Sequence, residues 1–193
     1  MNSPQGDSTQ LNDLKWLNLL SSNEATEELL KCCGSKHWAR RMATERPFNG
    51  AAELLTKATK IWWSLEPHDW LEAFGSHPKI GENKRRVSKE SQTESGVDMS
   101  HRWSEQEQSG VCDAKQETIN SLDELNRRYE TKFGYIFIVC ATGKSSEEML
   151  AILEDRLKND AAGELQIAAA EQAKITELRL KKLLVINDQK LSG

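Results

Sequence analysis

Residues 51–65, AAELLTKATKIWWSL, carry the clearest signal of the fold class. The apolar residues recur at steps of three and four, which places their side chains on one face of an α-helix. They are Ala51, Leu54, Leu55, Ala58, Ile61, Trp62 and Leu65. The stretch therefore predicts an amphipathic helix that follows Asn49, buries one face and is closed by Pro67.

Ser-x-x-Glu motifs of capping-box form mark three further helix starts. They are Ser21-x-x-Glu24, Ser104-x-x-Glu107 and Ser145-x-x-Glu148. Helical spacing continues from Ser104 to Gly134, and Gly34 and Gly134 are natural helix ends. The motifs predict a helix that ends at Cys33, one that begins at Ser104 and one that follows Ser145.

Shorter signals fill the intervals between these helices. Ser35 is expected to open a short turn through Met42, and Asp69 to cap a short helix over Trp70–Phe74 that Gly75 ends. The last helix is expected from about Glu164 to Ile186.

One run resembles a strand, namely Tyr135-Ile-Phe-Ile-Val-Cys-Ala141. A single strand has no partner for its backbone hydrogen bonds. The run is therefore expected to be a buried, irregular connection between helices.

The signals together predict one all-α domain, a helical bundle of about seven or eight helices with the apolar connection at 135–141. Residues 1–10 are expected to be a disordered N-terminus and 187–193 a C-terminal tail, with the domain spanning 11–186. Residues 83–102 hold few large apolar side chains and are expected to form an exposed, mobile loop.

Composition excludes several classes of function. The net charge of the 193 residues is −4, which argues against a nucleic-acid binder, and no apolar run is long enough to span a membrane. The four cysteines form no Cys-x-x-Cys motif and the N-terminus has no signal-peptide core. We expect an intracellular protein in a reducing compartment, the peroxisome or the cytosol.

Two familiar cofactor motifs fail on inspection. Gly143-Lys144-Ser145 resembles the end of a phosphate-binding loop, but the glycine needed five residues earlier is replaced by Ile138. No His-Glu-x-x-His motif or histidine pair on one helix face is present. Neither a metal site nor a cofactor is expected.

Three residues stand out as candidates for chemistry. His77 precedes Pro78 just after a helix end, so its imidazole is expected on a rigid corner, where it would act as an acid or base or simply bond its own turn. Glu107 is expected to project along an apolar stripe with Val111 and Ala114, or to complete a capping box. Arg179 lies among apolar neighbours and requires an anion, either an internal carboxylate or a substrate carboxylate.

Four ordered blocks of sequence, running from about Leu29 to Leu184, resemble the family of 2-oxo-4-hydroxy-4-carboxy-5-ureidoimidazoline (OHCU) decarboxylases. The sequences of these blocks look most similar to those of plant members. The blocks are Asp69-Trp70-Leu71-Glu72-Ala73-Phe74 with His77-Pro78-Lys79-Ile80-Gly81, Ser104-x-x-Glu107-Gln108, Tyr129-x-x-Lys132-Phe133-Gly134-Tyr135-x-Phe137-x-Val139-Cys140-Ala141, and Glu171-x-x-Lys174-Ile175-x-x-Leu178-Arg179-Leu180.

The resemblance implies roles for individual residues. His77, Glu107 and Arg179 match the family's catalytic positions. The remaining matched positions are expected to bind substrate, and they are Pro78, Ser104, Gln108, Phe137, Ile138, Val139, Cys140 and Ala141.

The resemblance also implies a reaction. Family members convert OHCU to (S)-allantoin in urate degradation, without cofactor or metal, and are commonly homodimers. Plant members are often joined to a hydroxyisourate hydrolase domain, which would be the expected partner. The competing hypotheses are a helical interaction or scaffold domain that has kept the fold, and a urate-pathway partner that presents an intermediate to a neighbouring hydrolase. The joint presence of His77, Glu107 and Arg179 favours the enzyme, because a scaffold has no need of all three.

Overall fold

The computed structural model describes residues 14–80, 96–108 and 115–191, and within these ranges it contains nine α-helices and no strand. The helices are α2 (Lys15–Leu19), α3 (Ser22–Cys33), α4 (Lys36–Thr44), α5 (Ala51–Trp62), α6 (Pro67–Gly75), α8 (Gly96–Glu107), α9 (Gln116–Phe133), α10 (Ser146–Arg156) and α11 (Ala161–Leu191). The predicted all-α class and single domain are confirmed, with slightly more helices than expected.

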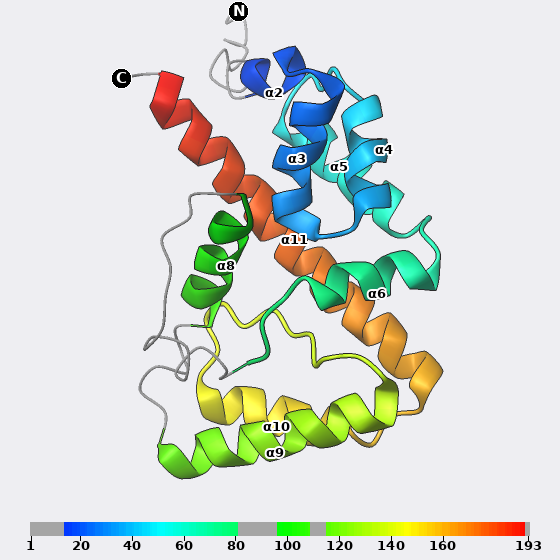
Figure 1. Cartoon of the computed structure of the whole chain (residues 1–193), viewed down its shortest axis with the longest axis vertical. Coiled ribbons are helices and arrows are strands. Elements are labelled where there is room, and N and C mark those ends of the chain that lie inside the picture. The colour runs from blue at the N-terminus through cyan, green and yellow to red at the C-terminus, as the bar shows by residue number, and fades with distance from the viewer. Residues whose placement is uncertain (1–13, 81–95, 109–114, 192–193) are drawn as a thin grey trace, which may run out of the picture.

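Helix α11 runs diagonally through the molecule and holds its two ends together (Figure 1). Helices α3, α5 and α6 pack against it, and α4 and α8 pack against α3. Helices α9 and α10 lie side by side and run in the same direction, at the opposite end of the molecule from α2 (Figure 1). The fold thus consists of a larger and a smaller group of helices that share one long helix.

The 31 residues of α11 form one helix because a buried stripe recurs along them every three or four residues. Its buried members are Glu164, Ala168, Ala169, Gln172, Ile175, Thr176, Arg179, Leu180, Leu183 and Leu184. Asp160 opens the helix by accepting hydrogen bonds from the backbone N–H groups of Ala162 and Gly163. The helix therefore begins before the predicted Glu164 and continues beyond Ile186 into the predicted tail.

The connection 135–141 is extended but pairs with no strand among the described residues, as predicted. Its side chains alternate between the two apolar clusters of the domain. Ile138 and Cys140 pack into the larger cluster, whereas Phe137, Val139 and Ala141 pack into the smaller cluster beside α9 and α10. The run resembles a strand because two hydrophobic surfaces, rather than a sheet, select its period of two.

Several predicted helix ends are confirmed. Ser21 and Ser145 each complete a capping box with the glutamate three residues later. Gly34 and Gly134 end α3 and α9 in the left-handed conformation, with φ of 84° and 81°. These local motifs act independently of the rest of the fold, which explains why the sequence reveals them.

The prediction of a loop over 83–102 is wrong at its C-terminal end, because α8 already begins at Gly96. Met99 packs against the larger cluster and Trp103 is buried in it, so tertiary contacts stabilise a helix that its composition does not favour. Ser104 consequently lies inside α8 and donates its hydroxyl to the Ser100 carbonyl, instead of capping a new helix. Residues 1–10 and 83–95 lie outside the described part of the chain.

Two other helix starts differ from the predictions. Helix α6 begins at Pro67, which suits the first turn of a helix, and Asp69 is a buried residue of that turn rather than its cap. Ser35 caps a full helix, α4, instead of a short turn. None of the described helices combines the length and apolar composition needed to cross a membrane.

The glycine at the end of α3 yields a stability prediction. A Cβ at Gly34 would need a left-handed backbone and would lie 2.6 Å from Ser76 Cβ, whereas a Cβ at Gly134 would meet nothing within 4 Å. Gly134→Ala should lower the free energy of unfolding by about 1–2 kcal/mol through its backbone alone. Gly34→Ala should lower it further, as measured by urea unfolding. Equal losses would contradict the close packing of Gly34 on Ser76.

Candidate active site

A recess of about 310 Å³, part of it open to solvent, brings several predicted residues together. The described residues that line it come from the end of α6, the end of α8, the connection after α9 and the middle of α11. They are His77, Ile80, Ser104, Glu107, Gln108, Val139, Ala141, Thr142 and Ile175. Four chain segments that are distant in sequence thus meet at one concave surface.

His77 lies on a turn fixed by hydrogen bonds. The Ser76 N–H donates to the Ala73 carbonyl and the His77 N–H to the Phe74 carbonyl, at 3.2 and 3.1 Å. The Ser76 hydroxyl also donates to the Ala73 carbonyl, at 2.7 Å. The half-buried His77 therefore lines the recess from a rigid corner, as the sequence predicted.

Glu107 forms a buried ion pair with Arg179. Arg179 Nε lies 3.1 Å from Glu107 Oε1 and Nη2 lies 2.9 Å from Oε2, a bidentate geometry. The same guanidinium donates to the hydroxyls of Ser104 and Ser100, at 2.8 and 3.3 Å. The exposed fractions of the two paired side chains are 8% for Glu107 and 1% for Arg179, so the pair is shielded from water.

These contacts change the environment expected for Glu107. The predicted apolar stripe involves residues 109–114, which lie outside the described ranges, and Glu107 instead ends α8. A second cation, Lys182, places Nζ 3.4 Å from Glu107 Oε1. Among the described residues, this carboxylate contacts two cations, and their combined charge favours an anionic ligand beside the recess.

Arg179 binds the Glu107 carboxylate from outside the described lining of the recess. Among the described residues it contacts Glu107 and the serines but does not line the recess. Of the two anions considered for it, the internal carboxylate is the one present. Direct binding of a substrate by Arg179 stays a prediction.

The connection after α9 forms one wall through alternate residues. Val139 and Ala141 line the recess, whereas the predicted Phe137, Ile138 and Cys140 are not among its lining residues. Arg156 Nη1 donates to the Ile138 carbonyl at 2.6 Å. Pro78 also lies outside the described lining.

Arg156 is itself held by a buried network. Arg156 Nη2 lies 2.5 Å from Glu164 Oε1. The Glu164 carboxylate also accepts a hydrogen bond from the Tyr129 hydroxyl. The Arg156 guanidinium lies 4.9 Å from the centre of the Phe137 ring. Since both charges of the pair are buried and satisfied, the network fixes the beginning of the wall.

Three lining residues were missed by sequence reasoning. Ile80 follows the His77-Pro78 corner, Thr142 follows the apolar run, and Ile175 precedes Arg179 by one helical turn. Their neighbours were identified, but nothing in an apolar or hydroxyl side chain distinguishes a pocket wall from ordinary packing. Only Ile175 carried a usable signal, its i−4 position relative to a buried arginine.

The described residues give little support for a metal site or for a cysteine nucleophile. The described part of the chain contains no group of three or more His, Cys, Asp or Glu side chains placed to hold a metal ion. Burial raises the pKa of the Cys140 thiol above its usual value, and burial raises that of Cys33 to about 12. These thiols are therefore poor nucleophiles at neutral pH.

A larger recess, of about 770 Å³ including open space, lies between α2, α3 and the end of α11. Glu24, Glu27 and Glu28 line it against a single lysine, Lys31. Its described lining contains no histidine and has an acidic edge, which disfavours an anion. The recess at His77 is the better candidate, because it combines an imidazole, a carboxylate, an amide, hydroxyls and backbone groups suited to a flat polar ligand.

The fold and the recess define an all-α domain built for acid–base chemistry on a small ligand. The chain belongs to the OHCU decarboxylase family, whose sequence model matches residues 18–181. A solved crystal structure of OHCU decarboxylase in the presence of (S)-allantoin is 38% identical, superposes with a TM-score of 0.67, and is matched over 82% of this chain and 98% of that one.

Two curated relatives are longer proteins. The uric acid degradation bifunctional protein TTL of Arabidopsis thaliana is 39% identical over 158 residues, which are 81% of this chain and 46% of that protein. The uric acid degradation bifunctional protein of Bacillus sp. (strain TB-90) is 28% identical over 171 residues, 88% of this chain and 32% of that protein. The chain thus spans less than half the length of each.

The Glu107–Arg179 pair should dominate local stability. Arg179→Met would leave a buried carboxylate without its bidentate partner and should lower the free energy of unfolding by about 3–5 kcal/mol. Combining it with Glu107→Gln should cost less than the sum of the two single changes. Urea unfolding of the four proteins measures this coupling. Lys181→Met, which breaks an exposed pair with Glu177, is the control and should cost at most about 1 kcal/mol. Additive losses at Glu107 and Arg179 would contradict the pairing.

Proposed function

We propose that this protein decarboxylates OHCU to (S)-allantoin in urate degradation. The observation that carries the proposal is the convergence of His77, Glu107, Val139 and Ala141 on one recess in a member of the OHCU decarboxylase family. A solved relative is described in the presence of (S)-allantoin, which supports this compound as the product.

The substrate's name defines the chemistry required. One ring carbon carries both a carboxyl and a hydroxyl group, next to the carbon that carries the ureido group. Breaking the bond to the carboxylate releases CO2 and leaves an electron pair, which the adjoining unsaturated ring accepts. The ring nitrogen that received the electron pair gains a proton in place of the one that the hydroxyl loses as its carbon becomes a carbonyl, and the carbon that carries the ureido group takes up one further proton on one face. The protein needs to orient the ring, stabilise its charge and control that face.

The residues of the recess match these tasks. His77 polarises the ring substituent or transfers the proton from its fixed corner. Glu107, held by Arg179, accepts hydrogen bonds from the substrate's hydroxyl or ureido groups, with Ser104 and Gln108 beside it. Backbone groups of Val139 and Ala141 support the developing charge on the ring. The positive charge of Arg179 and Lys182 attracts the anionic substrate.

Assembly and compartment are part of the proposal. We propose a homodimer on the family resemblance, and light scattering should then give twice the chain mass of 21.8 kDa. The mass of one chain would refute the dimer.

We also propose a reducing compartment, the peroxisome or the cytosol, because Cys32, Cys33 and Cys140 carry free thiols. Fluorescence microscopy of the tagged protein would test this. We also propose a hydroxyisourate hydrolase as a functional partner on the family resemblance, and the word bifunctional in the names of two relatives supports a second activity in those proteins.

The activity can be tested directly. OHCU is generated in situ from urate with an oxidase and a hydrolase, and the circular dichroism of the allantoin formed is followed. The protein should accelerate formation of the (S)-enantiomer over the racemic spontaneous product. No acceleration would favour the scaffold hypothesis. Activity that appears only when a hydrolase is bound to this protein would favour the presenting partner.

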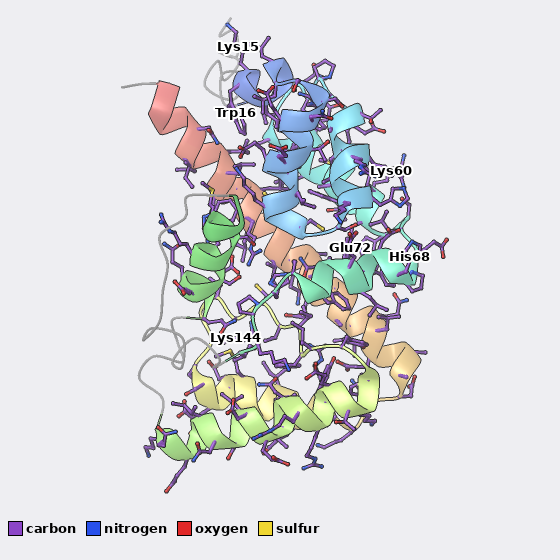
Figure 2. The ribbon with its side chains drawn as sticks, viewed as in Figure 1. Lys15, Trp16, Lys60, His68, Glu72 and Lys144 are labelled. Carbon is purple, nitrogen blue, oxygen red and sulfur yellow. The ribbon has the colours of Figure 1, made fainter. Side chains whose placement is uncertain are left out.

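His77→Asn should lower kcat by at least about 100-fold, because an amide cannot transfer the proton. The thermal melting midpoint should change little. His68→Asn is the matched control, since His68 is exposed at the outer end of α6 (Figure 2) and should leave kcat unchanged. If His77→Asn unfolds the protein or retains full activity, the imidazole has a structural role only.

A further inference from the structure

The face of α11 that meets the recess also carries Glu171, which is not among the described lining residues of the recess. Glu171, Ile175 and Arg179 follow one another at steps of four, so they share one side of the helix. Ile175 lines the recess and Arg179 holds Glu107. The remaining member of the row, Glu171, has a contact of a different kind.

Glu171 binds the backbone of the recess wall. Its Oε2 accepts a hydrogen bond from the Cys140 N–H at 2.8 Å, and its Oε1 pairs with Lys174 at 2.5 Å. The exposed fraction of its side chain is 15%. Burial raises the pKa of this carboxyl, but the hydrogen bonds from Lys174 and the Cys140 N–H outweigh burial and lower it overall.

Cys140 lies between the two wall residues Val139 and Ala141. A trans peptide is planar, so its N–H and C=O groups point in opposite directions. Fixing the Cys140 N–H therefore also fixes the direction of the Val139 carbonyl. On the other side of Cys140, Lys144 Nζ donates to the Cys140 carbonyl at 2.6 Å and fixes the direction of the Ala141 N–H in the same way.

The groups aimed by this arrangement are available for a ligand. Across the described ranges, neither the Val139 carbonyl nor the Ala141 N–H forms a hydrogen bond, although both residues are buried and line the recess. Buried backbone groups usually have partners. Figure 2 shows Lys144 on the connection itself, in the space between α8 and the α9–α10 pair.

We propose that Glu171 is a positioning residue of the decarboxylase: by accepting the Cys140 N–H, its carboxylate sets the plane of the Val139–Cys140 peptide against which the substrate ring is oriented. This proposal rests on the proposed function. It assigns the effect to the acceptor oxygen and not to the ion pair with Lys174.

Four single variants separate these contributions. Glu171→Ala removes the acceptor, whereas Glu171→Gln keeps a carbonyl oxygen at the same distance along the side chain and removes the charge. Lys174→Ala removes the ion pair and keeps the carboxylate. Glu177→Ala is the control on the same helix, because Glu177 forms an exposed pair with Lys181. Steady-state kinetics with OHCU formed in situ gives kcat and KM, and circular dichroism gives the melting midpoint.

Glu171→Ala should lower kcat by about ten- to a hundredfold with less than about a threefold change in KM, because a tilted wall misplaces the ring. Glu171→Gln, Lys174→Ala and Glu177→Ala should keep kcat within about threefold of wild type. Comparable melting midpoints for Glu171→Ala and Glu171→Gln would show that folding is not the cause.

An active wild type with an unaffected Glu171→Ala variant would overturn the positioning role alone, and so would a loss confined to KM. Equal losses in the Ala and Gln variants, or a matching loss in Lys174→Ala, would assign the effect to charge and overturn it too. An inactive wild type would refute the proposed function, and the positioning role with it.

Discussion

The buried pair between Arg179 of α11 and Glu107 of α8 is the constraint on which the site depends. A guanidinium without an anion would be very costly at 1% exposure, so the end of α8 must lie against α11 for Arg179 to be tolerated. The same contact places Ser104 and Glu107 at the recess and brings them opposite His77. Stability and site geometry are therefore coupled through one interaction, which links two helices far apart in sequence.

Helix α11 makes contacts that position the site at several points along its length. Its buried stripe packs against the larger group of helices, supplies Glu164 to the buried pair with Arg156 and supplies Ile175 to the recess. Glu171 and Arg179, two helical turns apart, reach the two walls of the recess from the same face. A single rigid element thus sets the separation between the backbone wall and the carboxylate. The recess thus depends on how α11 packs against the turn that carries His77 and against the connection that carries Val139 and Ala141.

The sequence predicted what depends on local physics. Capping boxes at Ser21 and Ser145, left-handed glycines at 34 and 134, the amphipathic helix at 51 and the unpaired run at 135–141 are all present. The start of α8 was missed because Met99 and Trp103 gain their stability from tertiary contacts. One recess is lined by His77, Ser104, Glu107, Gln108, Val139 and Ala141, and their roles stay predictions. The internal pairing of Arg179 and the role of Glu171 could not be predicted, since a sequence does not show which carboxylate or backbone group a side chain meets.

The structure implies that α11 holds two walls of the recess at a fixed separation around one flat polar ligand. A crystal structure of this chain with (S)-allantoin tests it most directly. The ring should lie in the recess, between His77 and the backbone of Val139 and Ala141, with Glu107 in contact with the ligand and still paired with Arg179. The Cys140 N–H should still donate to Glu171. Allantoin bound elsewhere would contradict the assignment of the recess as the binding site. Allantoin bound in the recess with the Glu171–Cys140 hydrogen bond broken would contradict the role of α11 in holding the wall.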